Sequence, residues 1–569
     1  MQHLQNRIAL GLGEIPADLL LRNVRLVNTL SGEIHACHLA VGQGLVLGFE
    51  EYPAHRVIDC QGQYLAPGFI ESHMHLESTL LAPVELARAM AARGTAAVVC
   101  DPHEIANVLG IKGLKYMLQA CRDLPVQIFF MLPSCVPATH LETAGAGISA
   151  ADMQDLLGSY GSRFLGLAEV MNFPGVLARD PGLLAKLELT RDLIQDGHAP
   201  GLSSQGLNAY ILAGPSSEHE CSALEEGREK LRKGMQIFIR QGTSEQNMQE
   251  LLPLVSDFNW PRFCLVSDDL HPLDLASQGH LDRILRQAVA AGLDPVRALQ
   301  MVSINPARHF GLRGKGALAP GYQADMVLLQ DLQDFKISQV FLQGRPLQEI
   351  EFPAHKGSSP SDMHLAKLQE GCFRIPAGSG LLRVIGLVPG QILTKALQLP
   401  PRLSQGQAIA DPERDLAKLA VLERHRASGN IGLGFVQGLG LKAGALASTV
   451  AHDSHNLIIA GASDSDMLAA ALRTQEMQGG MAVALDGRIL AELPLPIAGL
   501  MSDKSLPEVV QVMHDFNQAC RQMGLQAQDP FMLLSFLALP VIPELRLTDL
   551  GLVDVGSFDF VDLWTEEPS

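Results

Sequence analysis

The chain has 569 residues, of which 47% are hydrophobic, and its formal net charge is −18. This length predicts two or three domains, and this hydrophobic content excludes a disordered chain. A surface of such negative charge repels phosphate backbones, so nucleic acid is not expected as a partner. We expect no membrane span and no secretion signal, because no apolar run is long enough and the N-terminus lacks a basic start. The nine cysteines include no C-x-x-C pair, which favours reduced thiols in a cytoplasmic protein.

The first part of the chain has the pattern of short β-strands. Three leucine-rich or β-branched runs, broken by glycine or asparagine, occupy residues 19–28, 38–50 and 55–66. A similar pattern returns at residues 315–347, after a long region of different character. We therefore expect residues 1–65 and 312–355 to form one composite β-sandwich domain.

Between these two parts, short apolar runs alternate with helical patterns. The helical patterns include residues 83–94 and 151–161. Such alternation predicts parallel βαβ units, and wholly apolar strands are typical of a sheet that is covered on both faces. Residues 66–311 therefore predict an α/β fold, a TIM-like (β/α)8 barrel whose functional side chains follow the strands. The strand candidates are residues 94–102, 126–134, 163–171 and 262–269.

The last part of the chain is expected to be a separate mixed α/β domain, residues 363–569, joined by a polar linker at 355–362. Residues 438–443 match G-x-G-x-x-A, but strand and turn patterns follow them, which excludes a dinucleotide site. A polar group after this motif is either a second metal or substrate cluster or a polar turn between strands or at a domain interface. It comprises His452, Asp453, His455 and Asn456.

Imidazoles and carboxylates follow the predicted barrel strands. His73 and His75 end the stretch that begins PGFIESHMH, and residues i and i+2 of a strand point the same way, so both can reach one metal ion. Any one such residue alone is typical of a hydrogen-bonded loop. Their recurrence at positions that a barrel brings to one mouth instead predicts a metal site. The further members are Asp101, His103, Glu169, His198, His219 and Asp268.

Several long blocks of the sequence resemble the bacterial adenine deaminases of the amidohydrolase superfamily. They are PGFIESHMHLEST, DPHEIANVLG, AEVMNFPGV, DGHAPGL, SSEHE and SDD, and HRASGNIGLGFVQGLGLKAGALASTVAHDSHN and LPLPIAGLMSD in the last domain. The resemblance implies a β-sandwich split around a metal-bearing barrel. It also implies hydrolysis of adenine to hypoxanthine and ammonia in purine metabolism, with a binuclear manganese or iron centre; zinc is the alternative.

The resemblance also assigns roles to individual residues. It implies six metal ligands, with Glu169 as the carboxylate that bridges two ions. Asp268 is expected to move protons as well, and Glu77 is either a second proton carrier or a helix-capping carboxylate. Asp101 and His103 are assigned to the substrate, with roles as ligands or as supports of the ligands left open. The six ligands are His73, His75, Glu169, His198, His219 and Asp268.

The expected chemistry follows from what deamination requires. A metal ion lowers the pKa of bound water from about 15.7 toward roughly 7, and a nearby proton carrier delivers the proton to the ring or to the departing amine. The sequence motifs that two other groups of deaminases require are absent from this chain. The cytidine deaminase plan needs P-C-x-x-C, and the adenosine deaminases resemble H-A-G-E, where this chain has HAPG at 198–201. A bridging carboxylated lysine is disfavoured because Lys186 lies in a helical pattern.

Two other readings remain beside adenine deaminase. One is a related amidohydrolase that acts on another aminopurine or cyclic amide, and the other is a non-catalytic metal-binding protein. For either enzyme we expect a small-molecule substrate and water as partners, no membrane association, and a homo-oligomer, most simply a dimer.

Overall fold

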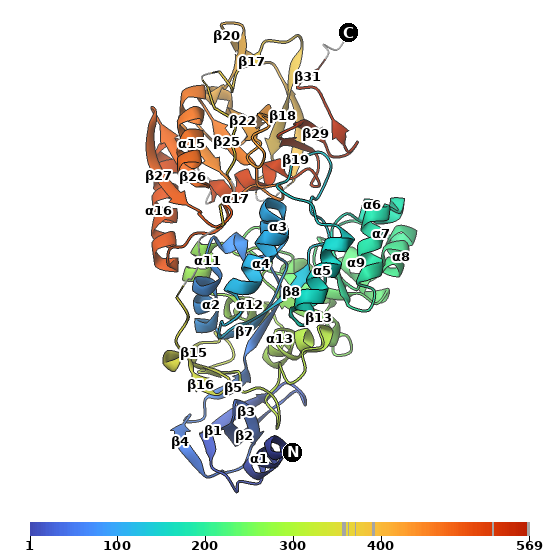
Figure 1. Ribbon diagram of the computed structural model, residues 1–569, viewed down its shortest axis with the longest axis vertical. Coiled ribbons are helices and arrows are strands. Elements are labelled where there is room, and N and C mark those ends of the chain that lie inside the picture. The colour runs from blue at the N-terminus through green and yellow to red at the C-terminus, as the bar shows by residue number, and fades with distance from the viewer. Residues whose placement is uncertain (355–359, 362, 370, 390–392, 526–528, 566–569) are drawn as a thin grey trace.

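The computed structural model describes residues 1–354, 360–361, 363–369, 371–389, 393–525 and 529–565 (Figure 1). A small β-sheet lies at one end of an elongated molecule, the barrel lies in the middle, and the C-terminal part lies at the other end (Figure 1). Most of the predicted linker at 355–362 falls outside the described residues. Within the described part of the chain, no helix has the length and apolar character needed to span a membrane.

The N-terminal sheet is completed by strands that come some 260 residues later in the chain. Its order is β16-β15-β14-β5-β1-β2-β3, and β4 pairs with β1. Met326 of β14 lies opposite Pro67 of β5, so the chain returns to this sheet after the barrel. Helix α1 spans Gln2–Gly11. The strands are β1 (Ala17–Asn28), β2 (Glu33–Gly42), β3 (Leu45–Gly48), β4 (Ala54–Asp59), β5 (Tyr64–Pro67), β14 (Met326–Leu329), β15 (Ile337–Leu342) and β16 (Arg345–Pro346).

Eight parallel strands form the barrel, which confirms the predicted fold class. Strands β6 to β10 form one parallel sheet and β11 to β13 another. The Ser216 N–H donates to the Gln195 carbonyl at 2.8 Å, which joins the two sheets at β10 and β11. Met74 pairs with Asp268, which joins them at β6 and the end of β13 and closes the barrel. The strands are β6 (Phe69–Met74), β7 (Thr95–Cys100), β8 (Gln127–Leu132), β9 (Phe164–Val170), β10 (Ile194–Gly197), β11 (Ser217–Glu218), β12 (Gln236–Arg240) and β13 (Phe263–Val266).

The alternation of side chains along each strand separates the barrel interior from its outer shell. On β7, Ala97 and Val99 join the interior cluster with Ile70 and Val266, whereas Val98 packs among the surrounding helices. This explains why the strands are apolar throughout. The helices are α2 (Pro83–Ala92), α3 (His103–Leu109), α4 (Ile111–Ala120), α5 (Ala150–Tyr160), α6 (Phe173–Ala178), α7 (Pro181–Leu189), α8 (Ser204–Ala213), α9 (Leu224–Arg232), α10 (Met248–Leu251), α11 (Pro272–Ser277), α12 (Leu281–Ala290), α13 (Pro295–Met301) and α14 (Ile304–His309).

The C-terminal part is built on a nine-stranded sheet in the order β19-β18-β23-β22-β25-β24-β26-β27, with β31 beside β18. No helix follows the G-x-G-x-x-A match in this described region, because β24 begins at Ala445. The strands of this sheet are β18 (Leu381–Leu387), β19 (Thr394–Leu399), β22 (Leu416–Leu422), β23 (Ile431–Gln437), β24 (Ala445–Ser448), β25 (Leu457–Gly461), β26 (Gly480–Leu485), β27 (Arg488–Pro494) and β31 (Trp564–Thr565). The helices are α15 (Asp464–Glu476), α16 (Leu506–Gln522) and α17 (Pro530–Ser535).

Two small sheets complete the C-terminal part. They consist of β17 (Ile375–Pro376), β20 (Arg402–Ser404) and β21 (Gln407–Ile409), and of β28 (Leu545–Thr548), β29 (Gly551–Asp554) and β30 (Asp559–Phe560). The whole part sits over the barrel, with α3 directed toward it (Figure 1). Thr548 Oγ1 donates to the Leu141 carbonyl at 2.7 Å, and the Ser502 N–H donates to the Leu80 carbonyl at 2.8 Å, so backbone loops of the barrel are tied to it.

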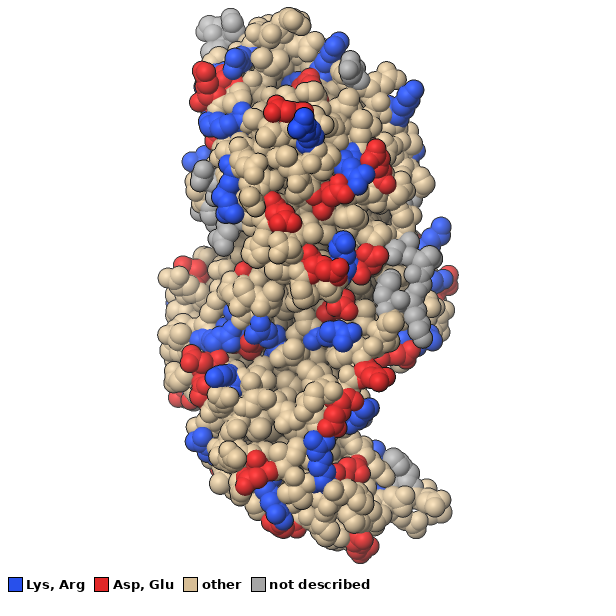
Figure 2. Space-filling model, turned by 90° about the vertical axis from the view of Figure 1, so that its left-hand side faces the viewer, with Lys and Arg blue, Asp and Glu red and all other residues tan. Residues whose placement is uncertain are grey.

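Basic and acidic side chains are interspersed over the surface. On the face shown in Figure 2, Lys and Arg lie among Asp and Glu along the whole length of the molecule. The described residues on this face therefore present mixed charge rather than one basic surface, although the chain as a whole carries the net charge of −18.

Candidate metal and active site

The six residues expected as metal ligands meet at the carboxyl end of the barrel strands. His73 lies in β6 and Glu169 in β9. His75, His198 and His219 directly follow β6, β10 and β11, and Asp268 is the second residue after β13. This placement follows from the parallel sheet, because the ends of its strands converge on one mouth. All six are buried except His198, which is partly exposed.

Glu169 lies at the centre of this group. Its Oε1 is 3.4 Å from His75 Nε2 and 3.5 Å from His103 Nδ1. Its Oε2 is 2.6 Å from His198 Nδ1 and 3.1 Å from His219 Nε2. Each carboxylate oxygen thus faces a different pair of imidazoles, the arrangement that a carboxylate between two metal ions requires.

Asp268 lies just after β13 and pairs with Met74 of β6, where the two strands adjoin. Its Oδ1 lies 3.2 Å from both His73 Nε2 and His75 Nε2, and its Oδ2 accepts a hydrogen bond from Arg240 at 2.7 Å. The backbone of Asp268 has a φ of +56°, a left-handed conformation that non-glycine residues adopt infrequently and that is enriched at functional sites. This conformation turns the side chain into the cluster directly after the strand.

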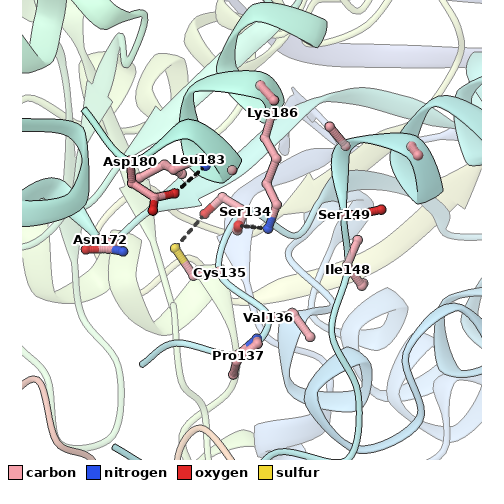
Figure 3. A pocket seen from close by; sticks show the side chains of 14 residues that line it. Ser134, Cys135, Val136, Pro137, Ile148, Ser149, Asn172, Asp180, Leu183 and Lys186 are labelled. Carbon is pink, nitrogen blue, oxygen red and sulfur yellow. Dashed lines mark hydrogen bonds between the residues drawn. The ribbon is translucent and has the colours of Figure 1, made fainter. Parts of the chain in front are cut away.

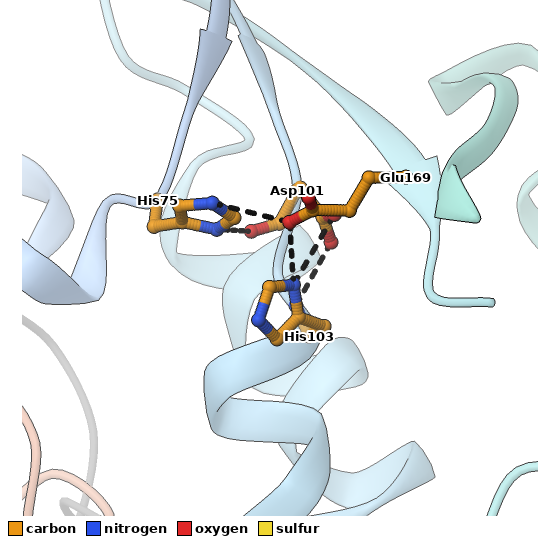
Figure 4. A group of neighbouring side chains, drawn as sticks. All are labelled: His75, Asp101, His103 and Glu169. Carbon is orange, nitrogen blue, oxygen red and sulfur yellow. Dashed lines mark hydrogen bonds and ion pairs between the residues drawn. The ribbon is translucent and has the colours of Figure 1, made fainter. Parts of the chain in front are cut away.

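Asp101 and His103 lie in the same cluster. Figure 4 shows His75, Asp101 and Glu169, from the ends of β6, β7 and β9, converging with His103 at the start of α3. His103 Nδ1 is 3.2 Å from Asp101 Oδ2. His75 Nδ1–H donates to the Asp101 carbonyl at 3.1 Å, which leaves the lone pair of His75 Nε2 directed at the carboxylates. That second hydrogen bond is the usual way in which a metal-binding histidine is oriented.

The donor set fits divalent metal ions. Three of its buried atoms make no well-directed hydrogen bond with any described residue: His73 Nε2, Asp101 Oδ2 and His103 Nδ1. Groups of opposite charge nevertheless lie 3.2 Å from each of them. Asp101 and His103 belong to one group of potential ligand atoms, and His73 belongs to two others. Buried ligand atoms without hydrogen bonds are expected where an ion binds, and leaving them unsatisfied costs about 1–3 kcal/mol each. Imidazole with carboxylate suits zinc, iron and manganese.

The charges of the cluster offset its burial. Burial alone would raise the pKa of Asp268, but the adjacent His73 and His75 and the Arg240 guanidinium hold it well below its usual value. Burial would likewise raise the pKa of Glu169, and the charges of His198 and His219 hold it well below. Both carboxyl groups are therefore anions at neutral pH, as metal ligands must be.

Glu77 lies in a short 3₁₀ helix, Glu77–Thr79, beside the cluster. Its Oε1 accepts a hydrogen bond at 3.1 Å from the backbone N–H of Ile105, in the first turn of α3. Burial raises the pKa of Glu77 to about 7. The contact that the structure provides is that of a helix cap, and proton transfer by Glu77 stays a prediction.

Three charged residues of the site were missed by sequence reasoning. Arg240 forms a bidentate ion pair with Glu220, and Glu220 Oε1 is 3.5 Å from His219 Nε2. Glu104 accepts hydrogen bonds from His452 and His455 of the C-terminal part. Glu220 and Glu104 each directly follow a histidine of the site, and Arg240 ends an apolar run, which were the available signals.

Lys186 does not enter the cluster. Its Nζ donates to the Ser134 carbonyl at 2.6 Å, and Ser134 Oγ donates to the Glu169 carbonyl at 2.5 Å. Figure 3 shows Lys186 and Ser134 in the wall of a separate cavity of about 500 Å³ between α5 and α7. The lysine therefore supports the backbone behind Glu169 and does not replace it as a bridge.

A buried lysine supports the two strand ends that carry His198 and His219. Lys230 is 0% exposed, and its Nζ contacts Glu218 at 2.9 Å, Glu226 at 2.8 Å and the Ala199 carbonyl at 2.7 Å. Glu218 in turn accepts the Ala199 N–H at 3.0 Å. The ion pair thus fixes residues next to two candidate ligands.

Substitution of Lys230 with methionine is expected to lower the free energy of unfolding by about 3–5 kcal/mol, because the Glu218 carboxylate is left buried without its partner. Urea unfolding followed by circular dichroism measures this. Lys233→Met is the control, since it removes a partly exposed ion pair with Glu229, for which about 0–1 kcal/mol is expected. Equal losses for the two variants would contradict the role given to Lys230.

Comparison with known proteins decides the family. Residues 64–347 match the amidohydrolase family, and residues 391–559 match the adenine deaminase C-terminal domain. The chain is 56% identical to an adenine deaminase of Oleidesulfovibrio alaskensis over 97% of both chains. The chain belongs to the adenine deaminase family. It is also 44% identical to the family member of Methanothrix thermoacetophila, over 99% of this chain and 100% of that one.

Two of the solved structures that resemble this member of the adenine deaminase family have low sequence identity to it. A crystal structure of an adenine deaminase covers 58% of the chain and 99% of its own length at 14% identity, with a TM-score of 0.44. A β-aspartyl dipeptidase of Fervidobacterium islandicum covers 58% and 96% at 15% identity, also with a TM-score of 0.44. The resemblance drawn from the sequence blocks is confirmed by the family-level matches.

Proposed function

We propose that the chain hydrolyses adenine to hypoxanthine and ammonia at the barrel mouth. Membership of the adenine deaminase family supports this reaction. The observation that carries the proposal is the position of Glu169, with one carboxylate oxygen toward His75 and His103 and the other toward His198 and His219.

Two divalent ions would be held by residues of this cluster. Ligand atoms of His73, His75 and Asp268 lie close enough together to hold one ion. Glu169 would be a shared ligand, since its Oε2 lies 2.6 Å from His198 Nδ1 and 3.1 Å from His219 Nε2. When bound, the metal supplies a Lewis acid that lets water act as a nucleophile near neutral pH. Manganese or iron is proposed as the ion, with zinc as the alternative, because all three accept imidazole and carboxylate ligands.

Asp268 is proposed as the proton carrier. The oxygen of water forms a bond to C6 of adenine while one of its protons passes to Asp268, which delivers that proton to the ring nitrogen. Asp268 then takes the second proton from the new hydroxyl group on C6 and gives it to the departing amino group. The C6–N bond then breaks, and ammonia and hypoxanthine are the balanced products. Asp268 suits this role because Arg240 orients one of its oxygens while the other faces the cluster.

Asp101 and His103 are proposed to hold the substrate against the cluster. His103 Nδ1 faces Glu169, whereas its Nε2 lies 3.6 Å from Glu104 of the same helix and 4.0 Å from Asp453 of the C-terminal part. The His103 ring therefore lies between the metal ligand Glu169 and the C-terminal part of the chain. Both residues also lie close enough to the cluster to be ligands themselves.

Removal of metal is expected to abolish adenine turnover. Chelation and dialysis should lower ammonia release to background, and addition of manganese or iron should restore it with two ions per chain. The test measures metal content and adenine conversion, by ammonia release and loss of adenine absorbance, on the same preparation. Full activity in metal-depleted protein would contradict the proposed centre.

A related amidohydrolase activity on another aminopurine or on a cyclic amide is the second candidate, since residues 64–347 match the amidohydrolase family as a whole. Rates with adenine, other aminopurines and cyclic ureides separate the two proposals. We further propose a cytoplasmic enzyme and a homodimer, with adenine and water as its partners and neither nucleic acid nor membrane. None of the nine cysteines, all of which are described, forms a disulfide in the structure, which is the arrangement expected of the proposed cytoplasmic enzyme.

A further inference from the structure

A loop of the C-terminal part reaches the barrel mouth. It joins β24 to β25, and its residues His452, Asp453 and His455 are buried against α3. His452 Nδ1–H donates to Glu104 Oε1 at 2.6 Å, and His455 Nε2–H donates to Glu104 Oε2. The covering part of the chain is thus anchored beside His103, the residue directly before Glu104.

Glu104, His452 and His455 form a hydrogen-bonded anchor and not a further metal site, although their ligand atoms lie close enough together to hold an ion. The backbone N–H of Ala451 donates to His455 Nδ1 at 3.2 Å, so that nitrogen holds a lone pair. The proton of neutral His455 must then sit on Nε2, where a metal ion would need the lone pair. Burial lowers the pKa of His455 to about 4, which keeps it neutral.

The anchor leaves one carboxylate oxygen of Asp453 without a hydrogen-bond partner among the described residues. Asp453 is 4% exposed, its Oδ1 is 4.0 Å from His103 Nε2, and its buried Oδ2 makes no hydrogen bond with any described residue. A buried carboxylate oxygen without a donor is costly, so an N–H or O–H group from outside the chain is expected there. Asp453 therefore points to a ligand and not to the packing of the two parts.

Adenine carries a donor that matches this position. If C6 lies near Glu169 and Asp268, a flat purine along the His103 ring extends toward Asp453 with its five-membered ring. That ring carries an N–H in the free base. We propose that Asp453 is a substrate-binding residue of this chain, whose carboxylate accepts the N9–H of the base, and that Glu104, His452 and His455 position it. This proposal rests on the proposed adenine deaminase function.

The neighbour of Asp453 suits the same edge of the base. Glu142 lies in the loop after β8, and burial together with the negative charge of Asp453 raises the pKa of Glu142 well above its usual value. Glu142 Oε2 is also buried and makes no hydrogen bond with any described residue. In its protonated form this carboxyl group can donate to a ring nitrogen, while Asp453 accepts the adjacent N–H. Such a donor–acceptor pair matches N3 and N9–H of a free base, and a substituent on N9 removes one of the two contacts.

The test uses the metal-loaded, full-length protein and two matched inhibitors, purine and 9-methylpurine, which differ in the N9–H. For the unchanged protein we expect purine to inhibit at least about 10-fold more tightly, the worth of one charge-assisted hydrogen bond. In Asp453→Ala the ratio of the two inhibition constants should fall toward 1. The KM for adenine should rise about 10- to 100-fold, with metal content unchanged. Asp453→Asn, which preserves the volume, should lower the ratio in the same direction if the alanine variant does not fold.

Asp549→Asn is the control. Asp549 is a buried acid of the same contact between the two parts, and its Oδ1 accepts from Thr143 N–H at 2.9 Å. It should leave the inhibitor ratio unchanged. An unchanged ratio in both Asp453 variants would overturn the assignment, even if KM rises. Absence of adenine turnover in the unchanged metal-loaded protein would instead refute the proposed function, so the two failures are distinguishable.

Discussion

Replacement of Asp268 with asparagine is expected to lower kcat for adenine by about 10²–10⁴-fold, the usual contribution of a positioned proton carrier. Asparagine preserves the shape of the side chain but cannot take a proton from water. The loss follows from the geometry, since one oxygen of Asp268 faces His73 and His75 and the other is held by Arg240. Steady-state ammonia release measures kcat, and circular dichroism verifies the fold.

The control for this variant is Asp257→Asn, which changes an exposed aspartate that pairs with Arg297 on the surface. It should retain full activity. If Asp268→Asn keeps kcat within about tenfold of the unchanged protein while it binds the same metal, proton transfer must be assigned to another residue. Glu77 would then be the next candidate, despite its contact with the backbone of α3.

Replacement of Glu169 with glutamine is expected to remove both metal binding and turnover. Glu169 contacts four imidazoles, and glutamine leaves an amide group where one oxygen anion faced two of them. Substitution of residues that hydrogen-bond to metal ligands already lowers metal affinity by about 10–100-fold. Loss of a ligand shared by two ions should therefore lower it by more than about 100-fold. Metal titration monitored by isothermal calorimetry measures the affinity, and ammonia release measures the activity.

Glu188→Gln serves as the matched control, because Glu188 lies exposed at the end of α7 and pairs only with its neighbour Arg191 among the described residues. It should bind metal as the unchanged protein does. Two ions bound with normal affinity by Glu169→Gln would show that the carboxylate is not shared between them. A folded variant without metal would support the bridging position.

The barrel was predictable because its strands have strong local patterns. Runs such as residues 94–102 and 163–171 are apolar throughout, as strands buried on both faces must be. Strand β11 was not predictable, since it contains two residues, Ser217 and Glu218, and has no periodicity. The role of Glu77 was undecided for a related reason, because its partner Ile105 lies 28 residues further along the chain.

The sequence by itself determined the chemistry that the site offers and the family to which the chain belongs. The histidines and carboxylates are local features, since each lies at or just after the end of a strand, and parallel strands must end together. Only the tertiary structure decided what surrounds them. Glu104 and His452 are 348 residues apart, and no local pattern specifies that they meet. Their contact depends on how the C-terminal part packs over the mouth, and that packing places Asp453 beside His103.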